Sequence, residues 1–234
     1  MRNEARCLSA AGNRQPVRIV TTSSLPQEAL IRVCDSAATL PHRRPHVHPA
    51  MLSGAHNPWS YAGQLIDSWS VLELCESPAL LDIVEELIGP DIVLWDSALW
   101  LPANRAADLQ WLADERSFWP VTPLAGVIVL INLSPSDFES GAPLLAHDIH
   151  EVSTAMAAVS SGLGTASPWL CIRYMPATSH FNRDPGFAPH RAVAAREPLI
   201  NYANRPIWLV RGEDRAGNDF VTGFNVTTPS WAPI

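Results

Sequence analysis

The stretch Ser77–Leu101, SPALLDIVEELIGPDIVLWDSALWL, predicts a helix followed directly by a strand. Ser77 is a residue type that begins helices, and proline is favoured at the next position. Apolar side chains then recur at helical spacing, at Leu80, Leu81, Val84, Leu87 and Ile88. Gly89-Pro90 ends the helix. From Asp91 the residues are β-branched and aromatic, which is typical of a strand.

Four further apolar segments, separated by proline and glycine, predict strands on the C-terminal side. They are PLAGVIVLINLSP (123–135), APLLAHD (142–148), PWLCIRYMP (168–176) and the start of the tail RPIWLVRGEDRAGNDF (205–220). On the N-terminal side, SLPQEALIRVCDSA (24–37) predicts a short helix, with Ser24 as a candidate N-cap and Pro26 in the first turn. The chain therefore begins with helices and continues with strands.

This order of elements indicates a mainly β fold with flanking helices. Residues 95–175 contain no helix of clear length, and a doubly wound parallel sheet needs helices between its strands. We therefore expect an antiparallel sandwich or jelly roll. Residues 1–25 are polar and are expected to be poorly ordered, and 26–234 are expected to form one domain.

Composition narrows the classes of partner. The 234 residues include 16 Lys and Arg and 23 Asp and Glu, a formal charge of −7. No basic run is present, so nucleic acid and anionic membranes are not expected. The four cysteines form no C-x-x-C pair, and the first residues lack the apolar core of a secretory signal. These features predict a cytoplasmic protein with reduced thiols that acts on a small molecule. They leave its oligomeric state open.

Two segments hold candidate site residues. LQWLADERSFWP (109–120) places Asp114 among aromatic side chains. LPHRRPHVHPAML (40–52) should be extended, since residues before proline avoid the helical region. On a strand His46 and His48 would point the same way and could share a metal. A solvated or substrate-facing loop is the alternative that we favour, because a metal site needs a third ligand.

Several motifs in chain order resemble the phytanoyl-CoA dioxygenase family. They are SPALLDIVEELIGPDIVLWDS, the W-x-x-D of WLAD, VIVLINLSPSDFESGAPLLAHD, CIRYMP and LVRGEDRAGN, and they cover about 45–220. The resemblance implies a double-stranded β-helix, also called a jelly roll or cupin-like fold. It also implies hydroxylation of a small organic substrate with iron(II) and 2-oxoglutarate. In the family two histidines and one carboxylate bind the iron, and an arginine holds the keto acid.

The sequence departs from the family at most of these positions. Asp114 matches the iron-binding carboxylate, but Leu112 and Val159 stand at the histidine positions, and neither can bind a metal. Arg173 is the nearest candidate for a cofactor-binding arginine, although it matches a different arginine of the family. The segment between His150 and Arg173 is also short, which predicts that one or two strands are missing.

Three hypotheses follow. The first is the family oxygenase, impaired by the loss of two ligands. The second is a metal-independent relative that binds or transforms a small apolar molecule, with Asp114 as a catalytic base and a pocket formed by aromatic side chains. The predicted pocket residues are His46, Trp100, Trp111, Phe118 and Trp119. The third is a non-functional shortened copy. His180 and His190, in a turn-rich segment, are expected to border the mouth of the site.

Overall fold

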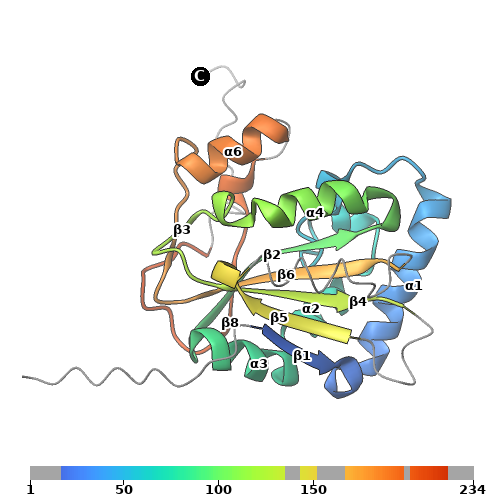
Figure 1. Ribbon diagram of the computed structural model, residues 1–234, viewed down its shortest axis with the longest axis horizontal. Coiled ribbons are helices and arrows are strands. Elements are labelled where there is room, and N and C mark those ends of the chain that lie inside the picture. Colours follow the sequence, from blue (N-terminus) through green and yellow to red (C-terminus); the bar gives the residue numbers. More distant parts are fainter. Residues whose placement is uncertain (1–16, 135–142, 152–166, 198–200, 221–234) are drawn as a thin grey trace, which may run out of the picture.

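A computed structural model describes residues 17–134, 143–151, 167–197 and 201–220 (Figure 1). Its centre is a six-stranded antiparallel sheet in the order β1-β5-β4-β6-β2-β8, and a second sheet pairs β3 with β7. The strands are β1 (Val17–Thr21), β2 (Ile92–Trp100), β3 (Val121–Thr122), β4 (Val127–Asn132), β5 (Pro143–Asp148), β6 (Trp169–Pro176), β7 (His180–Phe181) and β8 (Trp208–Arg211). The α-helices are α1 (Gln27–Arg43), α2 (Ser68–Cys75), α3 (Pro78–Ile88), α4 (Arg105–Ala113) and α6 (Ala188–Arg196).

Side chains of the large sheet alternate between two apolar cores. In β4, Val127, Val129 and Ile131 pack with α1, α2 and α3, whereas Ile128 and Leu130 pack with α4 and the small sheet. Successive side chains of a strand point to opposite faces, so a sheet covered on both faces has continuously apolar strands. Figure 1 shows α4 and α6 on one side of the sheet and α3 on the other.

The predicted fold class is confirmed. The protein is built on antiparallel sheets with flanking helices, and all the paired strands described are antiparallel. A jelly roll has two sheets. Within the described residues, the smaller one consists of β3 and β7 alone. The predicted helix at 78–88 and the strands from 92, 127, 143, 169 and 208 lie where the sequence indicates.

Three local expectations are wrong, and a fourth is untested over most of its length. Residues 1–25 are expected to be poorly ordered; residues 1–16 lie outside the described residues, whereas Val17–Thr21 pairs with β5 along the edge of the sheet. The first helix extends to Arg43, with Pro41 inside it, so LPHRRP begins as helix rather than extended chain. Helix α4 lies within 95–175, where no clear helix was expected, and α6 forms in the turn-rich 188–196 segment. Tertiary packing overrides weak local propensity in these segments.

None of the described helices is both long enough and apolar enough to cross a membrane.

Candidate functional site

A β-bulge in β2 turns two neighbouring side chains to one face of the sheet. The pairing of β2 with β6 shifts register between Leu94 and Asp96. Regular alternation would place Trp95 and Asp96 on opposite faces. The additional residue of a bulge re-aims the side chains that follow it, and both Trp95 and Asp96 line the same cavity.

Arg173 joins two buried carboxylates at this point. It lies opposite Asp96 on the adjacent strand β6, and its Nη1 donates to Asp96 Oδ2 at 2.9 Å. Its Nη2 donates to Glu115 Oε2 at 3.1 Å, and its Nε donates to Glu115 Oε1. The Trp119 indole N–H also donates to Glu115 Oε1, at 2.8 Å. All three nitrogens of the guanidinium are therefore bonded to carboxylates.

Arg205 extends this arrangement on the other side of Asp96. Its guanidinium forms an ion pair with Asp96, and its Nη2 donates to Ser53 Oγ at 2.8 Å. It also lies over the Tyr202 ring, 4.3 Å from the centroid. Glu115, Arg173, Asp96 and Arg205 therefore alternate in sign; we call them the charge chain. Their side chains are between 2% and 10% exposed, so the pairing satisfies charges that would be costly to bury alone.

The charge chain borders an aromatic cavity of about 70 Å³. Trp95, Trp100, Trp111 and Phe118 line it from β2, α4 and the turn after α4, and α6 contributes His190, Val193 and Glu197. A wider groove of about 620 Å³ adjoins it, since Ala50, Ser53 and Glu197 line both. Mainly apolar walls with a few polar groups are typical of small-molecule sites, which usually measure about 300–1,000 Å³, so the groove supplies room that the cavity alone lacks.

His190 presents a hydrogen-bond acceptor at this cavity. Its Nε2 lies 2.6 Å from the carbonyl oxygen of Asn182. A carbonyl only accepts, so Nε2 carries the proton and Nδ1 holds the lone pair of the neutral ring. Burial lowers the pKa of His190 below its usual value, with Arg205 and Arg183 contributing in the same direction. The ring is therefore neutral at pH 7.

The predicted carboxylate Asp114 lies outside the cavity lining. WLAD does not end a strand: Trp111, Leu112 and Ala113 end α4, and Asp114 caps it. In a helix, residues two apart diverge around the axis, so Leu112 is fully buried while Asp114 is exposed. Asp114 Oδ2 accepts from Arg196 Nη2 at 2.7 Å. Its neighbour Glu115 is the acid at the cavity.

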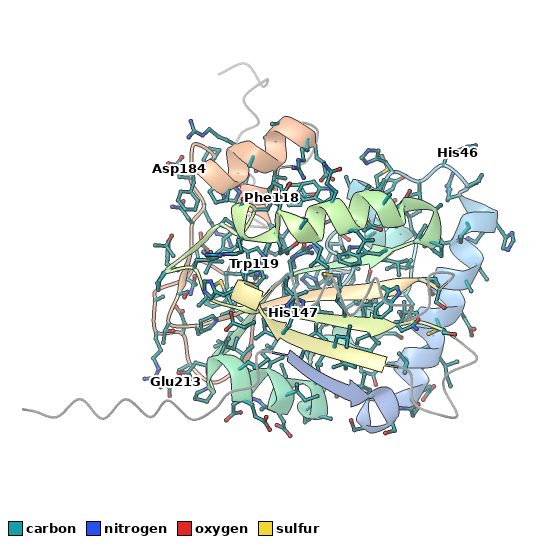
Figure 2. All side chains as sticks on the ribbon, in the orientation of Figure 1. His46, Phe118, Trp119, His147, Asp184 and Glu213 are labelled. Atoms are coloured by element: carbon teal, nitrogen blue, oxygen red, sulfur yellow. The ribbon has the colours of Figure 1, made fainter. Side chains whose placement is uncertain are left out.

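The structure brings together only some of the predicted pocket residues. Trp100, Trp111 and Phe118 line the cavity. Trp119 is buried outside the cavity lining, where its indole N–H donates to Glu115. His46 is exposed beyond α1, and Figure 2 shows it well away from Phe118 and Trp119. Val159 lies outside the described residues.

The described residues do not fit the iron site that the resemblance implies. Within them, no three His, Cys, Asp or Glu side chains come together in a way that could hold a metal ion. His48 Nδ1 instead accepts the backbone N–H of Ala50, capping a short turn. Arg173 does not fit a 2-oxoglutarate clamp either, because its three nitrogens already bind Asp96 and Glu115.

Sequence reasoning did not select Asp96, Glu115, Arg205 or Glu197 as site residues, and it placed His190 only at the mouth. One signal was present for Asp96. In DIVLWDSALWL the charged Asp96, followed by Ser97, interrupts a strand whose other residues are apolar. Such a residue is buried with partners, or lies at an irregularity of the strand.

Comparison with known proteins gives no family. No family model matches the chain, and no curated protein matches it. Among solved structures, the chain is similar to a non-heme monooxygenase, the ThoJ–Ni complex, at 13% identity and a TM-score of 0.43, over 87% of this chain and 83% of that one. It is also similar to CytC3 with Fe(II) and alpha-ketoglutarate, at 15% identity and a TM-score of 0.45, over 88% of each chain. Likeness at this level assigns no role to any residue.

Proposed function

We propose that this protein binds a small aromatic molecule in the cavity between β2, α4 and α6 together with the wider groove that adjoins it, and that binding needs no metal ion. The observation that carries the proposal is the cavity itself. Aromatic faces form its walls and the charge chain forms its polar border. Aromatic side chains provide a large apolar contact area with fixed ring geometry.

The charge chain supports a binding role because it is internally neutral. Two carboxylates and two guanidiniums offset one another at short distance. The hydrogen bonds of the charge chain join β2, β6 and the turn after α4, which carry walls of the cavity, so the cavity is formed before a ligand enters. Preformed sites lose less conformational entropy when they bind.

Hydroxylation with iron(II) and 2-oxoglutarate is the second candidate. The order of motifs that resembles the phytanoyl-CoA dioxygenase family supports it. It would require metal ligands from residues that the structure does not describe. The two candidates differ in one simple respect, since only the oxygenase needs iron for its chemistry.

Calorimetric titration with 4-ethylphenol, in the presence of EDTA, tests the proposal. For a ligand of this size we expect a dissociation constant on the order of 0.1–1 mM. Val193→Phe should abolish binding, because Val193 lines the cavity from α6 and a larger ring would fill it.

The matched control is Ile31→Phe, which adds a ring on the exposed face of α1 and should leave the affinity unchanged. Absence of binding to the unaltered protein would reject the proposal. Binding that appears only after Fe(II) is supplied would favour the oxygenase.

A further inference from the structure

The cavity presents more acceptors and negative charge than a neutral aromatic ligand requires. Among the described residues, Arg173 and Arg205 offset the charges of Asp96 and Glu115. The cavity is also lined by Glu197, a further carboxylate that this pairing does not offset.

Glu197 is the carboxylate placed where a ligand would meet it. It lines both the cavity and the groove. Its described hydrogen-bond partner is uncharged, because Tyr202 Oη donates to Glu197 Oε2. Arg196, the adjacent cation, is paired with Asp114 instead. The carboxylate of Glu197 is therefore not neutralised by a described basic side chain.

Helix α6 adds to this preference for positive charge. Glu197 is the C-cap of α6, and its backbone N–H bonds to the carbonyl of Val193. The C-terminal end of a helix carries partial negative charge, and cations near it are stabilised. The Glu197 carboxylate and the C-terminal end of α6 both favour a positively charged group at the junction of the cavity and the groove.

His190 independently indicates a ligand that carries a hydrogen-bond donor. It is 6% exposed, it lines the cavity, and its Nδ1 is an acceptor with no described partner. His190, Val193 and Glu197 follow one face of α6 at helical spacing. The two acceptors are thus about 10 Å apart along the helix axis, with an apolar side chain between them.

The aromatic walls suit a cation that also has an aromatic body. Arg196 already lies over Trp111 and Phe118, 5.0 and 4.7 Å from the ring centroids. Ring faces of this kind attract ammonium groups as they attract guanidinium.

We infer that the ligand is an arylalkyl ammonium with a hydroxyl on its ring. The ammonium binds at Glu197 by the end of α6, the ring lies among Trp100, Trp111 and Phe118, and the hydroxyl donates to His190 Nδ1. This inference rests on the proposed function and deepens it by naming the class of ligand.

Three probes that share one ring and differ in charge test the inference. They are tyramine, which is a cation, 4-ethylphenol, which is neutral, and 3-(4-hydroxyphenyl)propionate, which is an anion. By titration calorimetry tyramine should bind about tenfold more tightly than 4-ethylphenol, and the propionate should bind most weakly. Glu197→Gln should remove the tenfold advantage of tyramine over 4-ethylphenol.

Glu213→Gln is the matched control, because Glu213 is exposed and Figure 2 shows it far from Phe118. Equal affinities for tyramine and 4-ethylphenol in the unaltered protein would overturn the inference and leave the proposed function standing. The same holds if Glu197→Gln folds and keeps the advantage of tyramine. Failure of all three probes to bind would reject the proposed function as well. The probe series on the unaltered protein decides the question even if the variant does not fold.

Discussion

Replacing Arg173 with methionine is expected to lower the free energy of unfolding by about 3–5 kcal/mol. Arg173 is the described partner that compensates the charge of Glu115, and it also bonds to Asp96. Methionine fills a similar volume but leaves Glu115, which is 2% exposed, with only the Trp119 N–H. Chemical denaturation at pH 7 measures the change.

Two comparisons isolate the buried charge as the cause. Arg211→Met also removes an arginine paired with two carboxylates, Asp82 and Glu85, but at the surface; it should cost no more than about 1 kcal/mol. The double variant Arg173→Met with Glu115→Gln should be more stable than Arg173→Met alone, because it leaves no unpaired charge at position 115. A cost for Arg173→Met as small as that for Arg211→Met would show that the charge chain does not stabilise the fold.

Acidification from pH 7.5 to 5 is expected to destabilise the protein by about 4 kcal/mol through two buried histidines. Burial lowers the pKa of His56 to about 3 and that of His147 to about 4. In the unfolded chain both titrate near 6.5. Below pH 6.5 the unfolded chain therefore binds protons that the folded protein does not. Each histidine contributes stability that is complete above pH 6.5 and falls as the pH decreases towards its folded pKa.

The His56→Asn variant tests this account of the pH dependence. His56 Nδ1 lies 2.8 Å from Ser97 Oγ, and asparagine can offer a polar atom at a similar position. Between pH 7.5 and 5 the variant should lose about 2 kcal/mol less than the unaltered protein. His42→Gln, on the exposed surface of α1, serves as the control and should leave the slope unchanged. A slope that His56→Asn does not alter would mean that His56 takes up a proton in the folded state.

The sheet could be predicted from the sequence because its strands are apolar on both faces. Segments such as VIVLIN, at 127–132, have a composition that suits only a buried strand. Helix α3 could be predicted equally well, because Pro78 and Gly89 mark its two ends. The start of β2 follows directly from the end of α3.

The site could not be predicted in the same way, because it depends on a register shift and on an unrecognised helix. The sequence does not show that the β2–β6 pairing changes between Leu94 and Asp96. Helix α4 has a weak apolar stripe, with Leu112 fully buried and Leu109 partly so. Once 105–113 is helical, Asp114 turns to the surface and Glu115 turns inward. The motif comparison points to Asp114 as the carboxylate of the site, whereas the packing places Glu115 at the cavity.

The central claim is that a small aromatic molecule binds in this cavity without a metal ion. The indole N–H signals of the nine tryptophans, followed by two-dimensional NMR during titration with 4-ethylphenol and EDTA, test it most directly. We expect the signals of Trp95, Trp100 and Trp111 to shift, since these side chains line the cavity. The signals of Trp59 and Trp69, which are 66% and 64% exposed, should not move. Shifts confined to those two exposed tryptophans, or no shift until Fe(II) is added, would contradict the claim.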